Sequence, residues 1–143
     1  MKDILIQLLT ALVGSLGFSL VFGLRRRYLP AAALGGLLSW GLFLLLEALS
    51  LPGFLSALLA SAFAVVYAEL LAKGFRSPAT LFLVPAIIPL VPGSSLYYAM
   101  SCAVRGDLGA ARSYSSLTLE YALAIAAGIS FVIAARELRS PRR

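Results

Sequence analysis

The residues that could carry chemistry are concentrated in one apolar stretch interrupted by three prolines. Pro85, Pro89 and Pro92 fall within it, and the sequence Gly-Ser-Ser follows at residues 93–95. A proline inside a helix removes a backbone donor and clashes with the preceding turn, at a cost of about 3 kcal/mol. In hydrocarbon, the freed carbonyls must be satisfied by neighbouring helices or by water in a cavity. We therefore expect this break to face a cavity rather than lipid.

The residues after the break predict a helix end that binds an anion. Gly93 provides a flexible joint, and Ser94 and Ser95 are good N-caps for a half-helix over about residues 96–104. Its free N–H groups and positive dipole end would point toward the middle of the membrane. Broken helices of this kind bind carboxylates in secondary transporters. The predicted substrate-binding residues are Pro85, Pro89, Pro92, Gly93, Ser94, Ser95 and Tyr97. The alternative is a proline kink that merely shapes the bundle.

Glu120 is a candidate for coupling transport to protons. It lies six residues into the last apolar run, about 9 Å deep at 1.5 Å per residue. Ser113 and Ser116 share its helical face, and an ionisable residue in a span is a functional candidate by default. The alternative is an interfacial carboxylate paired with Arg112 or Arg105.

Other polar residues in the apolar runs have weaker claims. Glu69 is a second coupling candidate, although a local ion pair with Lys73, four residues later, fits it better. Glu47 lies near the outer end of its run, where we expect contact with water. Tyr98 and Tyr121 are candidates, with Tyr97, for lining a polar path.

The residue types exclude several classes of protein. There is no histidine, and Cys102 is the only cysteine, so a Cys/His metal site and a Cys–His or Ser–His nucleophile are excluded. No phosphate-binding P-loop pattern and no charged ring typical of a pore is present. The sequence therefore predicts neither an enzyme nor a cofactor. Any transport would be driven by a gradient or by a separate ATPase.

The composition is that of a protein that works within a lipid bilayer. Hydrophobic residues make up 61% of the 143 residues and charged residues 13%, against about 25% charged in soluble domains. A span needs about 20 apolar residues. We predict an all-α integral membrane protein, with residues 1–143 forming a single transmembrane domain of five helices. The predicted spans are residues 4–24, 30–50, 54–72, 79–104, which is broken at the prolines, and 114–135.

Basic residues predict the orientation of these spans. They cluster at Arg25–Arg27, at Lys73 and Arg76, and in the tail 136–143, which a five-span bundle places on one side. Because basic loops stay in the cytoplasm, we predict N-out, C-in topology with a cytoplasmic tail. A re-entrant hairpin over residues 79–104 would put that tail outside, so a full crossing is favoured. The net charge of +6 is thereby explained without a nucleic-acid partner.

Two stripes of small residues predict close helix packing. Such faces let helix backbones approach one another in lipid. The stripes are Ala11, Ser15, Ser19 and Gly23 in the first run, and Ala57, Ser61, Ala64 and Ala68 in the third.

The segment PAIIPLVPGSSLY, from Pro85 to Tyr97, resembles the threonine/serine exporter family. It is preceded by Lys-x-x-Arg-Ser-Pro-Ala-Thr from Lys73 to Thr80. The similarity is to the C-terminal five-span half of that family, which also occurs as a separate small subunit, as in a succinate exporter. The resemblance implies export of threonine, serine or a small dicarboxylate across the inner (cytoplasmic) membrane. It also implies a larger five-span partner subunit, related as an inverted repeat, with the site at the interface. The alternative function is a non-transporting scaffold or assembly subunit.

Overall fold

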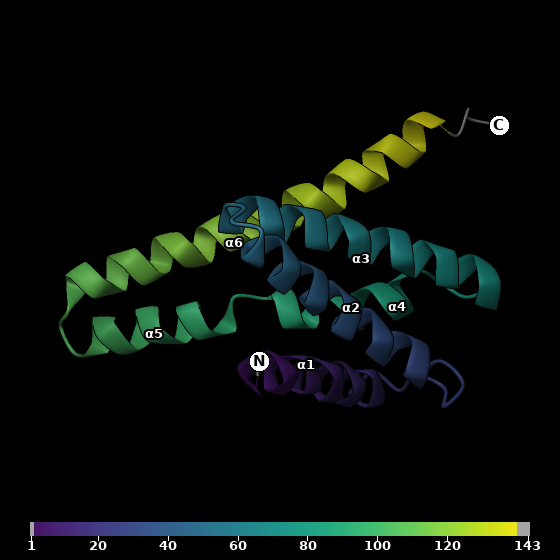
Figure 1. The fold of residues 1–143 in the computed structure, drawn as a ribbon, viewed down its shortest axis with the longest axis horizontal. Helices are drawn as coiled ribbons and strands as arrows, with labels where there is room; N and C mark the ends of the chain where they lie inside the picture. The colour runs from purple at the N-terminus through teal and green to yellow at the C-terminus, as the bar shows by residue number, and fades with distance from the viewer. Residues whose placement is uncertain (1, 140–143) are drawn as a thin grey trace.

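The computed structural model describes residues 2–139, which form a bundle of helices (Figure 1). The elements are α1 (Lys2–Val21), α2 (Leu29–Ala48), α3 (Gly53–Phe75), α4 (Thr80–Ile87), the short 3-10 helix η1 (Ile88–Leu90), α5 (Gly93–Val104) and α6 (Leu108–Arg139). Helices α1, α2, α3 and α6 are each long and apolar enough to cross a membrane, and α4, η1 and α5 together would add a fifth crossing. The prediction of an all-helical, multi-pass membrane protein is confirmed, with four or five candidate spans.

Local backbone chemistry determines where the helices begin and end. Pro30 lies in the first turn of α2, where its missing N–H is not needed. Gly23 follows α1 with a φ of 67°, and Arg76 ends α3 in the left-handed region with a φ of 50°. Helix α6 begins earlier than the predicted residue 114, because the Asp107 carboxylate accepts a hydrogen bond from the Ala110 N–H at 3.0 Å.

The fourth run is broken as predicted. Val91 is extended between η1 and α5, with φ −61° and ψ 126°, and the two halves are bent by 50°. The first half, α4, packs against α2 and α3, whereas α5 packs against α6. In Figure 1, α5 runs onward from the break, away from α4, and forms with the start of α6 a hairpin that extends beyond α1–α4.

The chain reverses direction at each turn between long elements. The α1–α2 and α3–α4 loops lie at the same end of the molecule as the C-terminal end of α6 (Figure 1). This end carries Arg25–Arg27, Arg76 and Arg136. Residues 140–143 of the predicted basic tail lie outside the described residues. The start of α1 and the α2–α3 turn lie on the side of α1–α4 away from these loops, and the α5–α6 turn lies farther out in the same direction (Figure 1).

Helix α2 is at the centre of the packing, and two adjacent glycines make this possible. A Cβ atom at Gly35 would lie 2.9 Å from the Tyr67 ring of α3 and 3.1 Å from Ala86 of α4. A Cβ atom at Gly36 would overlap the Ser15 hydroxyl of α1. Any larger residue at these positions would therefore push apart three helices that contact α2.

The stripes of small residues form buried contact faces, as predicted, with one exception. In α1, Ala11, Ser15 and Ser19 are buried, but Gly23 is exposed because it lies after the end of the helix. The whole α3 stripe is buried, from Ala57 to Ala68. Gly128 of α6 crosses α3 here, so closely that a Cβ atom would overlap Ser61 Oγ and the Leu58 carbonyl oxygen.

Substitution of Gly128 tests this crossing. Gly128→Ala should destabilise the protein by about 1–3 kcal/mol, the usual cost of overpacking a close contact. The α3 backbone would have to move away to accommodate the methyl group. Gly17→Ala in α1 is the matched control, since a Cβ atom there meets nothing within 4 Å. The measurement is the temperature at which detergent-purified protein loses monodispersity, and equal melting of the two variants would contradict the close crossing.

Candidate functional site

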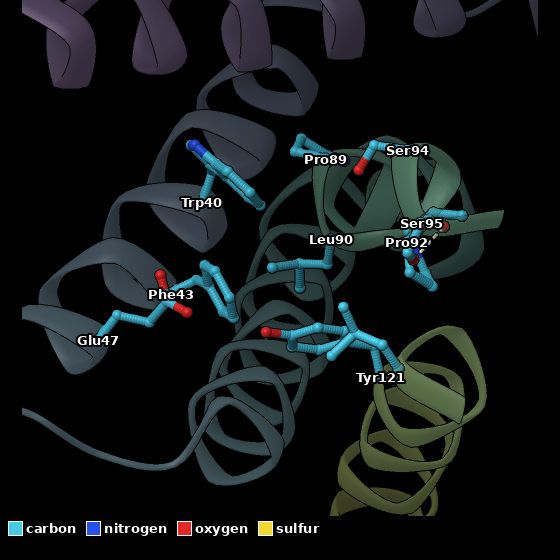
Figure 2. Close-up of a pocket in the computed structure, with 11 residues that line it drawn as sticks. Trp40, Phe43, Glu47, Pro89, Leu90, Pro92, Ser94, Ser95 and Tyr121 are labelled. Atoms are coloured by element: carbon cyan, nitrogen blue, oxygen red, sulfur yellow. Dashed lines mark hydrogen bonds between the residues drawn. The ribbon is translucent and has the colours of Figure 1, made fainter. Parts of the chain in front are cut away.

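A cavity of about 260 Å³ lies at the break in the fourth run (Figure 2). Its walls come from α2, from η1 and the start of α5, and from α6. The lining residues are Trp40, Phe43, Glu47, Pro89, Leu90, Val91, Pro92, Ser94, Ser95, Leu117 and Tyr121. The broken segment thus faces a hollow, as its prolines predict.

Aromatic rings form the α2 and α6 sides of this cavity. Trp40 and Phe43 are stacked with ring centroids 5.1 Å apart. The Tyr121 ring of α6 meets Phe43 edge-on at 6.1 Å. A Cβ atom on Gly53, the first residue of α3, would lie 2.6 Å from the Tyr121 hydroxyl. The cavity is therefore near the end of the bundle where α2 and α3 meet, rather than at its middle.

The predicted capping role of Ser94 and Ser95 is wrong. Helix α5 begins at Gly93 rather than near residue 96, and the cap position belongs to Pro92, which makes no side-chain cap bond. Both serines therefore lie in the first turn. The Ser95 hydroxyl donates to the Pro92 carbonyl at 3.1 Å and accepts from Thr118 of α6 at 2.9 Å. It fastens α5 to α6 beside the cavity.

The first turn of α5 nevertheless retains free backbone donors. The Gly93 N–H donates to the Val91 carbonyl at 2.7 Å, and the Leu96 N–H donates to the Pro92 carbonyl at 3.2 Å. Among the described residues, the N–H groups of Ser94 and Ser95 have no carbonyl acceptor. Two donors at the positive end of a helix dipole are thus available next to the cavity, an arrangement that suits a carboxylate.

The structure brings together part of the predicted substrate site. Pro89, Pro92, Ser94 and Ser95 line the cavity. Gly93 lies between Pro92 and Ser94 in the sequence but is not itself a lining residue, and an added Cβ atom there meets nothing within 4 Å.

Two predicted members of the substrate site lie elsewhere. Pro85 is fully buried, with its carbonyl oxygen 3.2 Å from the position of a Cβ atom on Gly36 of α2. Tyr97 is outside the cavity, with 67% of its surface exposed. Its ring packs edge-on against Tyr98, which in turn lies 5.5 Å from the Tyr114 ring of α6.

Glu120 lies on the exposed face of α6, next to Tyr121 but outside the cavity lining. Within the described part of the chain it forms no ion pair, so the alternative of pairing with Arg105 or Arg112 is wrong. Arg105 instead donates to the Ser101 hydroxyl of its own helix. An unpaired carboxylate therefore faces outward from the middle of a candidate span.

Glu69 is ion-paired, but with a different partner from the one predicted. Its carboxylate lies 2.8 Å from Arg136 of α6, rather than pairing with Lys73 of its own helix. The crossing of α3 and α6 brings the two helices close enough for Glu69 and Arg136 to pair. Lys73 lines a second hollow with Glu69 and Arg136 at the basic end of the molecule.

Sequence reasoning missed the contribution of α2 to the cavity. Trp40, Phe43 and Glu47 are spaced i, i+3 and i+7, which places them on one helical face. Glu47 is exposed, as expected, and it also lines the cavity. Its position in the last turn of α2 could have identified it as a candidate site residue from the sequence, because a carboxylate at the negative end of a helix dipole is unfavourable.

Comparison with known proteins identifies one family. The sequence model of the family described as Threonine/Serine exporter, ThrE matches residues 7–135. No curated protein and no solved structure matches the chain. The matched range contains every residue that lines the cavity at the break.

Proposed function

Because the chain belongs to the threonine/serine exporter family, we propose that it is a subunit of a secondary exporter that moves threonine, serine or similar small amino acids out of the cell. One observation carries this proposal: the proline break opens onto a cavity beside the free N–H groups of Ser94 and Ser95. A substrate carboxylate would bind there. A small dicarboxylate such as succinate is the alternative substrate.

The proposal includes five crossings of the inner (cytoplasmic) membrane, with the N-terminus outside. A bend of 50° supports a broken crossing, since a re-entrant hairpin needs the chain to turn back on itself. The gathering of Arg25–Arg27, Arg76 and Arg136 at one end supports a cytoplasmic position for that end. The α5–α6 turn would then face outward.

The proposal also includes a larger five-span partner subunit that covers α5 and the outer face of α6. Helix α5 packs against α6, and its remaining surface exposes Leu96, Tyr97, Met100 and Val104. Glu120 on α6 is exposed and unpaired, and a bare carboxylate facing lipid is costly. A partner would shield it and close the cavity from the open side. A scaffold subunit remains the alternative function, in which the break would transport nothing.

Within such a complex, Glu120 is the proposed proton-coupling residue, because a carboxylate at a subunit interface can exchange a proton as the complex changes state. Glu69 is the second candidate. Its ion pair with Arg136 joins α3 to α6, so protonation would loosen that contact.

Substitution at the break tests the proposed site. Gly93→Leu should lower threonine efflux by more than about tenfold, because the side chain occupies open space where backbone and substrate must approach. Ser95→Ala should lower it only about fivefold or less, since losing a neutral hydrogen bond costs about 1 kcal/mol and the N–H groups remain. Efflux of labelled threonine from cells is the measurement, with monodisperse purification as the folding control. A folded Gly93→Leu variant that transports normally would make the break a structural kink, as the scaffold alternative requires.

Neutralising Glu120 tests proton coupling. Glu120→Gln should abolish efflux driven by a proton gradient while leaving threonine exchange at equal pH intact, because exchange needs substrate binding without net proton movement. Glu137→Gln, at the exposed end of α6, is the matched control. Proteoliposomes with and without a pH gradient provide the measurement. Gradient-driven efflux at the normal rate would assign Glu120 a purely structural role.

Cysteine labelling tests the topology in a Cys102→Ala background. Arg76→Cys and Glu137→Cys should react with a membrane-impermeant maleimide only after the cytoplasmic side is opened. Leu108→Cys should react in intact cells, because it lies at the opposite end of the bundle. Reaction of Glu137→Cys from outside would favour four crossings and a re-entrant segment.

A further inference from the structure

We propose that Glu47 binds the α-ammonium group of the substrate, so that the cavity selects zwitterionic amino acids over carboxylates that lack an amine. This inference rests on the proposed export of small amino acids. It adds the residue that recognises the amine and thereby separates an amino acid from a dicarboxylate.

The cavity is polarised from one side to the other. Its lining contains one acidic side chain, Glu47, and no basic one. Figure 2 shows Glu47 and Phe43 on one side, and Pro92 and Ser95 on the opposite side, with Leu90 between them. The side with Ser95 offers the free N–H groups of α5. A small molecule spanning the cavity therefore meets a negative group at one end and hydrogen-bond donors at the other.

The surroundings of Glu47 favour a cation. Glu47 lies in the last turn of α2, where the backbone carbonyls already give a negative potential. Within the described chain, no arginine or lysine pairs with it. The electrostatic cost of placing a carboxylate there is relieved when a positively charged ligand group binds.

Aromatic rings on the same side add to this preference. Trp40 and Phe43 lie on the helical face that carries Glu47, and the Tyr121 hydroxyl points toward this side of the cavity (Figure 2). Ring faces attract ammonium groups, tryptophan most strongly. A dicarboxylate, by contrast, would bring its second negative charge toward Glu47. The same cavity therefore attracts one substrate class and repels the other.

The test compares threonine with 3-hydroxybutyrate, which keeps the carboxylate and hydroxyl but lacks the amine. The full chain, with any partner that co-purifies with it, is reconstituted in proteoliposomes at equal pH on both sides. Exchange of labelled threonine is then inhibited by each unlabelled compound. Glu47→Gln should raise the half-inhibitory concentration of threonine by about tenfold or more, as expected for losing a charged partner, and change that of 3-hydroxybutyrate by less than about twofold.

Two further variants make the result specific. Glu47→Asp keeps the charge and should retain most of the preference for threonine. Glu137→Gln makes the same chemical change outside the cavity and should behave as the wild type. Monodisperse purification confirms that each variant folds.

Three results would overturn the inference. Equal weakening of both ligands by Glu47→Gln would mean that Glu47 only shapes the cavity. Unchanged threonine exchange, with loss of gradient-driven efflux alone, would make Glu47 a proton carrier. These two results would leave amino-acid export standing, whereas a wild-type protein that exchanges succinate and not threonine would overturn both proposals together.

Discussion

In an apolar bundle, every backbone N–H and C=O group needs a partner within the protein, and three prolines prevent this in the fourth run. The chain responds by tightening into η1, where the Val91 N–H donates to the Ile88 carbonyl at 3.2 Å. It then restarts as α5 after an extended residue. The donors left over at Ser94 and Ser95 are the ones that adjoin the cavity. The candidate site therefore lies where the prolines leave backbone groups without helical hydrogen-bond partners.

The remaining helices are arranged so that this broken segment can be buried. Gly35 and Gly36 of α2 remove the side chains that would separate α2 from α1, α3 and α4. Pro85 is fully enclosed there. Close contact between helix backbones replaces the hydrophobic driving force that lipid cannot provide. The small residues of α2 therefore allow the close helix packing that buries the first part of the broken segment.

The sequence was sufficient to predict the helical class, the break and much of one wall of the cavity. These follow from hydropathy and from proline chemistry, which act locally. The sequence was not sufficient to predict the position of Tyr97, which lies exposed outside the cavity because another face of α5 packs against α6. Nor did it predict the pairing of Glu69 with Arg136, which depends on where α3 and α6 cross. For Glu47 the sequence predicted only contact with water. Its position across the cavity from the first turn of α5 depends on the tertiary arrangement and could not be predicted.

The division of the fourth run between two sets of neighbours has a mechanical consequence. Helix α4 packs against α2 and α3, while α5 packs against the start of α6. The two groups meet at Val91 and Pro92, where the helical hydrogen bonds are already interrupted, and at the crossing of Gly128 over Ser61. A rotation about these two points would change the width of the cavity without breaking a single helical hydrogen bond. Such a rotation would take place beside the cavity, because the walls of the cavity belong to both groups.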